Sequence, residues 1–253
     1  MLYFFPDKCN NFLFHFIFYV LADLCNIEKY SKFNTPIKYD WQKEAVELMA
    51  PDYIYTEDST GTYFEGTPYI KELKGGVPER YYHFIRDTIF SNNPHLINLE
   101  EPRRFIFIDR KKNSYRHIIN LPEEIHGFEK IYLEDYSMSE KIKLFQNAKV
   151  IVSPFGSGLT MAVFSHIKTK IIEITVHNAE ELECLHYKSI CSALSISYNT
   201  YTKVEISRPD NETYRDNYNY KLLEIEDFLD TLRREYINIH ESPTTVLRSV
   251  STS

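Results

Sequence analysis

Short apolar runs alternate with segments of helical pattern between residues 105 and 194. The apolar runs cover residues 105–109, 130–134, 150–153 and 170–175. Helical patterns cover residues 122–126, 138–148, 159–166 and 179–194, and the third of these helices starts directly after a glycine-containing turn. Ser137 and Glu140 have the spacing of a capping box, which marks the start of the second helix. Strands that alternate with helices in this way predict a parallel sheet covered by helices on both faces.

The first 100 residues have a different pattern. We expect an apolar helix at residues 9–30, further helices at 40–50 and 78–90, and short strands at 52–56 and 62–64. A stretch with asparagine and proline at residues 92–102 is the best domain boundary. The sequence therefore predicts a reduced α/β lobe at residues 1–100 and a Rossmann-like sheet lobe at residues 101–240. A helix at 220–237 ends the second lobe, and a disordered polar tail follows at 241–253.

One segment, KVIVSPFGSGLT at residues 149–160, reads as a buried strand, a turn of small residues and a helix start. Such a turn can bring backbone N–H groups and a helix N-terminus close to a phosphate group. By itself the motif is weak, because many turns of this type bind nothing. The candidate phosphate-site residues in and around this turn are Ser153, Phe155, Gly156, Ser157, Gly158, Leu159 and Thr160.

Two arginines strengthen this hypothesis. Arg110 directly follows the apolar run at 105–109, and Arg116 and Asn120 come shortly after it. Ligands of open α/β sheets bind beyond the carboxyl ends of the strands, so we expect Arg110 and the turn to face one crevice. A guanidinium group can form forked hydrogen bonds to phosphate oxygens. The alternative is that both arginines lie on the surface and pair with carboxylates such as Glu123 or Glu124.

Composition limits the class of partner and the compartment. A chain of 253 residues with 43% hydrophobic residues can form one large domain or two small ones. The formal net charge of −7 argues against a nucleic-acid-binding protein, which needs a basic face. The four cysteines, Cys9, Cys25, Cys184 and Cys191, lack the spacing of a zinc site. They predict free thiols in a reducing compartment, the cytoplasm.

The apolar segment at residues 12–22 is too short to span a bilayer. We therefore expect no transmembrane span and interpret the segment as a buried helix. The alternative is a signal peptide, which would place the chain in the lumen of the secretory pathway. Peripheral membrane contact and the oligomeric state stay open.

Six segments, taken in order, resemble glycosyltransferase family 61. They are FIFIDR at 105–110, RHIIN at 116–120, YLEDYSMSE at 132–140, LFQNA at 144–148, the 150–160 segment and IIEI at 171–174. The segment NFLFHF at residues 11–16 is similar to a helix of the family that has asparagine, histidine and an aromatic residue. The resemblance implies an α/β fold of the GT-B type, with two Rossmann-like lobes and the donor bound by the C-terminal one. It also implies inverting, metal-independent transfer of a sugar from a nucleotide sugar, a UDP-sugar, with no cofactor.

The resemblance gives the candidate residues roles in that reaction. Breaking the sugar–phosphate bond builds negative charge on the diphosphate, which Arg110, Arg116 and the turn would stabilise. Glu173 could accept hydrogen bonds from the ribose hydroxyls, or could be a carboxylate without a ligand. His15 is the candidate base for the acceptor hydroxyl, although a histidine in an apolar helix is more often a core residue. Asp23 is the reserve candidate, because it follows about two helical turns later.

The acceptor would be a glycan, a glycolipid or a protein glycan held in the cleft between the lobes. Aromatic rings of the N-terminal lobe are candidate stacking platforms for it: Tyr53, Tyr55, Tyr63, Tyr81 and Tyr82.

Two other classes of function remain as alternatives. The first is a catalytically inactive relative that binds a nucleotide sugar or glycan, or acts as a scaffold. Phe155 favours it, because family 61 commonly has a histidine there, and so does the reduced N-terminal lobe. The second is an NAD(P)-dependent oxidoreductase, which is disfavoured because the turn lacks the third glycine of the dinucleotide-binding fingerprint.

Overall fold

The computed structural model describes residues 2–4, 13–22, 32–34, 39–49, 55–56, 77–111, 115–176, 185–208 and 218–240. Several predictions fall outside these residues: the strand at 62–64, the tail at 241–253, and Asp23, Tyr53 and Tyr63. The side chains of His15 and Tyr55 also lie outside the described part.

Five parallel strands form the central sheet, in the order β5-β4-β6-β7-β8. The strands are β4 (Arg104–Ile108), β5 (Glu129–Ile131), β6 (Ala148–Pro154), β7 (Lys170–Ile174) and β8 (Ser197–Tyr201). The predicted parallel sheet is confirmed. From β4 the chain first adds β5 on one side, and it then crosses back to add β6 on the other side of β4. The direction in which strands are added therefore reverses between β4 and β6. In doubly wound α/β proteins, ligands bind beyond the carboxyl ends of the strands at this reversal.

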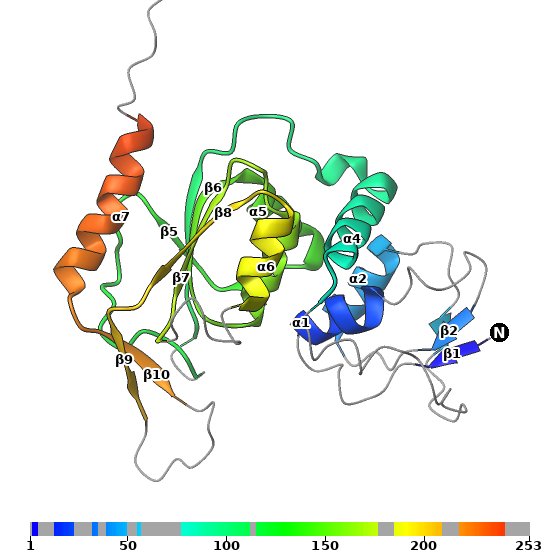
Figure 1. Cartoon of the computed structure of the whole chain (residues 1–253), viewed down its shortest axis with the longest axis horizontal. Helices are drawn as coiled ribbons and strands as arrows, with labels where there is room; N and C mark the ends of the chain where they lie inside the picture. The colour runs from blue at the N-terminus through cyan, green and yellow to red at the C-terminus, as the bar shows by residue number, and fades with distance from the viewer. Residues whose placement is uncertain are drawn as a thin grey trace, which may run out of the picture.

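Helices cover both faces of this sheet, as predicted (Figure 1). One face packs against α5 (Met138–Asn147), the 3₁₀ helix η7 (Ser157–Phe164) and α6 (Leu185–Ala193). The other face packs against α7 (Ile225–His240) and the antiparallel pair β9 (Val204–Ser207) and β10 (Asn219–Leu222). Alternate residues of β4 point to opposite faces: Ile106 belongs to the first buried cluster and Phe107 to the second.

The N-terminal part contains helices and a small parallel sheet. Its strands are β1 (Leu2–Phe4), β2 (Lys32–Asn34) and β3 (Tyr55–Thr56), in that order. Its helices are α1 (Leu13–His15), the π-helical η2 (Phe16–Leu21), α2 (Asp40–Met49) and α4 (Glu79–Asn92), followed by the short 3₁₀ helix η5 (Pro94–Leu96). The predicted helices at 40–50 and 78–90 are confirmed. Figure 1 places α1, α2 and α4 together, beyond α6 as seen from the sheet.

The N-terminal helices and the sheet share one buried apolar cluster, which includes Phe16 of η2, Tyr82 of α4 and Ile151 of β6. Residues 16–18 and 21–22 are fully buried, so the prediction of burial is confirmed for the described part of the apolar segment. The division into two lobes at residue 100 stays a prediction.

Three predicted helices are wrong in type or extent. Residues 122–126 are irregular: Ile125 pairs with Phe128 in an isolated bridge, and the turn between them contains Gly127 with a φ of 75°. The helix predicted at 159–166 is the 3₁₀ helix η7, whose start contains Ser157 and Gly158, two residues that favour an α-helix weakly. Residues 219–222 form strand β10, and α7 begins only at Ile225.

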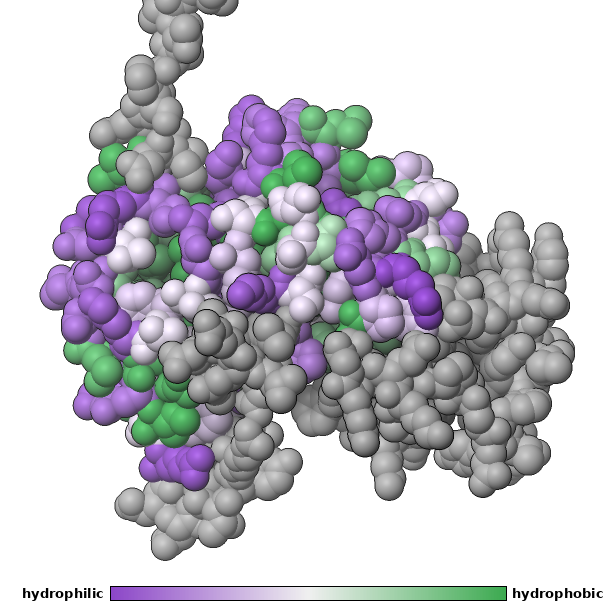
Figure 2. Space-filling model, viewed as in Figure 1, coloured by the Kyte–Doolittle hydropathy of each residue, from purple (hydrophilic) through white to green (hydrophobic). Residues whose placement is uncertain are grey.

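The surface in Figure 2 shows small hydrophobic patches separated by hydrophilic residues on the described part of that face. Among the described helices, none combines the length and the apolar character that a bilayer span requires.

Candidate active site

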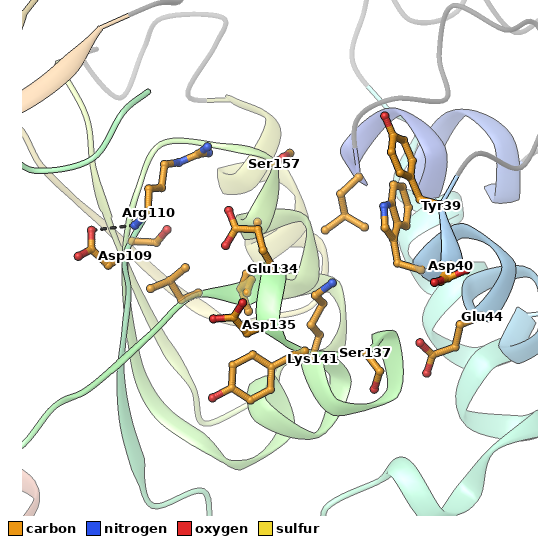
Figure 3. Close-up of a pocket in the computed structure, with 17 residues that line it drawn as sticks. Tyr39, Asp40, Glu44, Asp109, Arg110, Glu134, Asp135, Ser137, Lys141 and Ser157 are labelled. Atoms are coloured by element: carbon orange, nitrogen blue, oxygen red, sulfur yellow. Dashed lines mark hydrogen bonds between the residues drawn. The ribbon is translucent and has the colours of Figure 1, made fainter. Parts of the chain in front are cut away.

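A cavity of about 800 Å³ lies beyond the carboxyl ends of β4 and β6, at the reversal of strand order (Figure 3). The sheet side contributes Ile108, Asp109, Arg110, Ser153, Ser157 and Gly158. The facing wall comes from the N-terminal part and contributes Leu13, Tyr39, Asp40, Trp41 and Glu44. The floor comes from residues between β5 and α5, among them Glu134 and Asp135, and from Lys141 of α5. The cavity therefore combines residues from both halves of the chain.

Arg110 extends from the end of β4 toward the turn that follows β6. Its guanidinium lies against Gly156 so closely that any side chain at position 156 would overlap Nη2. Burial lowers the pKa of Arg110, and the nearby charge of Arg116 acts in the same direction. Within the described part of the chain, this guanidinium has no ion pair and no hydrogen bond. Asp109, next to it, instead forms an ion pair with Lys130, with 3.2 Å between Oδ2 and Nζ.

Arg116 lies beside the same turn. Its guanidinium carbon is 5.4 Å from the centre of the Phe155 ring and 5.7 Å from that of Tyr218. Its backbone has a φ of 67°, a left-handed conformation that is strained for a residue with a side chain. Arg116 N donates a hydrogen bond to the carbonyl of Tyr218, with 2.5 Å between the two atoms, and this bond stabilises the left-handed backbone of Arg116. The structure thus brings Arg110, Arg116 and the turn together.

The turn itself exposes backbone donors. The first hydrogen bond of η7 runs from Leu159 N to the carbonyl of Gly156, at 3.0 Å. The N–H groups of residues 156–158 precede it and have no partner inside the helix. Ser153, Ser157 and Gly158 line the cavity, whereas Leu159 and Thr160 are fully buried. The Ser153 hydroxyl donates to the carbonyl of Pro154 at 2.9 Å, so the donors that this segment offers to a ligand are backbone groups and Ser157.

We expect Gly156→Ala to lower kcat/KM about tenfold or more, because the new methyl group must displace the Arg110 guanidinium. Stability should change little, since the end of an arginine side chain moves easily. Steady-state kinetics and thermal unfolding measure the two effects. As a contrast, Gly127→Ala should lower the melting temperature and leave kcat/KM unchanged, because Gly127 has a positive φ and packs on Tyr236. Normal kinetics in Gly156→Ala would contradict this placement of Arg110.

Asn120, a predicted donor-binding residue, ties two segments together. Its side-chain Nδ2 donates to the carbonyl of Leu222 and its Oδ1 accepts from Leu222 N, both at 2.9 Å. This pair of hydrogen bonds joins the segment after Arg116 to β10. Asn120 does not line the cavity.

Asn120→Ala should therefore lower the free energy of unfolding by about 1–3 kcal/mol, because it leaves two backbone groups of β10 without their partners. Urea denaturation measures this. Asn147→Ala is a control with a smaller expected effect, because within the described structure that side chain donates just to the carbonyl of Lys143, in its own exposed turn of α5. Equal stability of the Asn120 variant and the wild type would contradict the structural role.

Glu173 is fully buried between β7 and α6 and does not line the cavity. Its Oε2 accepts a hydrogen bond from the Tyr198 hydroxyl at 2.5 Å, and its Oε1 has no hydrogen-bond partner among the described residues. Burial raises its pKa to about 7. Burial and the charge of Glu173 raise the pKa of Tyr187, whereas the charges of Arg110 and Arg116 lower it. A ribose contact of Glu173 stays a prediction.

Carboxylates dominate the middle of the cavity. Asp135 forms an ion pair with Lys111 at 2.5 Å, and Glu44 accepts hydrogen bonds from the first backbone N–H groups of α5. Asp40 and Glu134 have no ion pair among the described residues. In Figure 3, Glu134 lies between Arg110 and Lys141. The described residues contain no cluster of three metal-ligating side chains.

Sequence reasoning assigned no role to Glu134, although a signal was available. Residues 133–135 form the 3₁₀ helix η6 directly after β5, so Glu134 comes from the carboxyl end of a strand. Ligands of open α/β sheets bind beyond the carboxyl ends of the strands, so the rule that predicts Arg110 as a site residue also predicts Glu134.

The predicted aromatic platforms are wrong for two residues. Tyr81 and Tyr82 are 4% and 1% exposed and belong to the core. The rings that line the cavity are instead Tyr39 and Trp41, at the start of α2, and Tyr136, just before α5.

His15 is the base that the sequence predicts. The backbone of His15 is in α1, close to the cavity residue Leu13, but its side chain and Asp23 lie outside the described part. Their catalytic roles stay predictions. Of the cysteines, Cys191 is described and is a buried free thiol, as predicted.

A family model described as Glycosyltransferase 61 matches residues 13–172. The match covers more than half of the chain and contains every residue that lines the cavity. The chain therefore belongs to glycosyltransferase family 61 and is a glycosyltransferase, as its sequence segments indicated. A search of curated proteins found no match.

Proposed function

We propose that this glycosyltransferase transfers a sugar from a nucleoside diphosphate sugar, a UDP-sugar, to a hydroxyl group of a carbohydrate acceptor with inversion. The observation that supports this most is the guanidinium of Arg110, which lies at the cavity and forms no ion pair or hydrogen bond with the described part of the chain. A partly buried cation at the reversal point of a parallel sheet suits an anionic ligand.

The reaction has one bond-breaking and one bond-forming event. The bond between the anomeric carbon and the diphosphate oxygen breaks, and the diphosphate leaves with the electron pair. The acceptor oxygen bonds to the opposite face of the same carbon and loses its proton to a base. Arg110, Arg116 and the N–H groups of residues 156–158 would stabilise the charge that builds on the diphosphate. We propose that these groups suffice without a divalent metal.

Glu134 is the candidate base among the described residues, beside the sequence candidate His15. It lines the cavity, and its charge acts on Arg110, so it lies near the proposed diphosphate position. A carboxylate within hydrogen-bond reach of the acceptor hydroxyl can take its proton. Glu134→Gln should lower kcat while UDP binding persists. If His15→Ala lowers kcat and Glu134→Gln does not, the base is His15.

Two measurements test the proposed function. In a thermal-shift screen of UDP, GDP and CMP with EDTA present, UDP should raise the melting temperature, because a ligand that binds only the folded state stabilises it. In a transfer assay, release of UDP should accompany glycoside formation, and NMR of the product should show an inverted anomeric centre. A screen in which no nucleotide raises the melting temperature would contradict the proposal, as would a retained configuration.

A binding protein without turnover is the second candidate. Phe155 favours it, because this ring packs on Tyr187, with 5.7 Å between ring centres, and provides no hydrogen-bond donor beside the turn. Binding of UDP without any release of UDP from UDP-sugars would support this second candidate.

A further inference from the structure

Tyr39 and Trp41 form a fixed aromatic surface on one wall of the cavity. Their rings are nearly parallel, 9° apart, with 6.1 Å between the ring centres. The fully buried ring of Phe16 packs edge-on against Trp41, with 5.3 Å between the centres. Tyr39 N donates to Oε1 of the buried Gln42 at 3.1 Å, which fixes the chain at the start of α2. The two rings are therefore held in position before a ligand binds.

This aromatic surface is open to solvent. Tyr39 is 46% exposed, although most large apolar side chains of the described part are buried. Both rings line the cavity opposite Arg110, and in Figure 3 Tyr39 lies across the cavity from Arg110 and Ser157.

The charges of the cavity divide it into two ends. Arg110, with Arg116 behind it, makes one end cationic. Asp40 provides a carboxylate beside the aromatic surface, whereas Glu134 lies between Arg110 and the cavity residue Lys141; neither carboxylate has an ion pair among the described residues. A diphosphate is favoured beside Arg110, whereas the carboxylate of Asp40 disfavours it beside the aromatic surface. A neutral ligand with hydroxyl groups suits the second end, because carboxylates accept hydrogen bonds from hydroxyls.

A sugar ring has both features that this end requires. Its C–H bonds form an apolar face that packs against the face of an aromatic ring. Its hydroxyl groups point outward from the rim, where Asp40 and Glu134 can accept their hydrogen bonds. A cavity of about 800 Å³ falls in the upper part of the usual range for ligand pockets, so it has room for such a ring beside the donor.

We propose that Tyr39 and Trp41 form the acceptor subsite and stack against the pyranose ring that receives the transferred sugar. This inference rests on the proposed function and gives its acceptor a chemical class: a neutral sugar ring with one apolar face. Glu134 lies between this ring and the diphosphate end, where the accepting hydroxyl must be deprotonated.

Trp41 is the single tryptophan of the chain, so its fluorescence reports directly on this subsite. We expect methyl glycosides of xylose, galactose, mannose and N-acetylglucosamine, titrated separately, to include at least one that changes the Trp41 emission saturably. Tyr39→Ala should remove or weaken that change. UDP alone should leave the emission unchanged, because it binds at the other end.

Kinetics with the glycoside that responds test the same inference. Tyr39→Ala and Trp41→Ala should each raise the acceptor KM about tenfold, equivalent to about 1.4 kcal/mol of binding free energy. The donor KM and the UDP-induced thermal shift should stay unchanged. Trp41→Phe should restore part of the acceptor affinity. Leu99→Ala is the control, because Leu99 is 92% exposed and lies outside the cavity.

An unchanged acceptor KM in Tyr39→Ala, whose exposed side chain can be removed without opening the core, would overturn the inference. A raised donor KM with an unchanged acceptor KM would also overturn it and would assign the rings to the nucleobase. Absence of UDP binding and UDP release, together with saccharide-dependent Trp41 emission, would instead contradict the proposed function and leave the sugar subsite standing.

Discussion

Arg110→Ala should reduce kcat/KM for sugar transfer about 100-fold to 1,000-fold, the usual cost of removing one donor that stabilises developing charge. Arg110 lines the proposed diphosphate end of the cavity, and its guanidinium lies against Gly156. Its loss leaves the leaving diphosphate with backbone donors and Arg116. Initial rates with a UDP-sugar measure the effect on transfer, and the UDP-induced thermal shift should fall in parallel.

Arg104→Ala is the matched control. Arg104 begins the strand that Arg110 follows, and it forms an exposed ion pair with Glu129 at 2.5 Å, far from the cavity lining. Exposed pairs of this kind contribute about 0–1 kcal/mol to stability. Transfer should be normal in this variant. If both arginine variants lose activity equally, or if Arg110→Ala keeps wild-type rates, the assignment of the diphosphate site is wrong.

Glu173 should make the protein less stable as the pH rises toward neutrality. In the unfolded chain this carboxyl group loses its proton near its ordinary value, whereas burial in the folded chain raises its pKa to about 7. The folded state therefore holds more protons between these two values. Stability should be fully present below about pH 4.5 and should fall by up to about 3 kcal/mol as the pH passes about 7. Urea denaturation at a series of pH values measures this slope.

Glu173→Gln should remove this contribution, because an amide does not titrate in this range. His166 has a pKa lowered by burial and contributes a slope of opposite sign near neutral pH, so the variant must be compared directly with the wild type. Glu140→Gln is the control: hydrogen bonds from Ser137 lower the pKa of Glu140, so its titration lies below this window. Parallel stability curves for wild type and Glu173→Gln would refute the prediction.

The parts of the fold that sequence predicts are those with a strong local signal. Strands β4, β6 and β7 are buried on both faces and therefore read as continuous apolar runs. The capping box at α5 is local as well, and both of its hydrogen bonds are present. Strand β8 was missed because Ser197–Tyr201 is a polar edge strand that is only partly buried. Strand β10 was read as helix, although Tyr218, Tyr220 and Leu222 are buried with a period of two.

The residues of the candidate site also differ in whether a local sequence signal predicts them. The rule of strand ends locates Arg110 and the turn, because it depends on one sheet. Trp41 could not be found in this way, because it reaches the cavity only through the packing of α2 against the sheet lobe. Asn120 has the chemistry of a ligand-binding side chain, but its partners on β10 come from a distant part of the chain. Side-chain type alone does not reveal such partners.

The most direct test of the central claim is phosphorus NMR of UDP titrated with this protein in the presence of EDTA. We expect the two diphosphate resonances to shift or broaden saturably with the wild type and to stay unchanged with Arg110→Ala. Unchanged resonances with the wild type, or an identical response in both proteins, would contradict it.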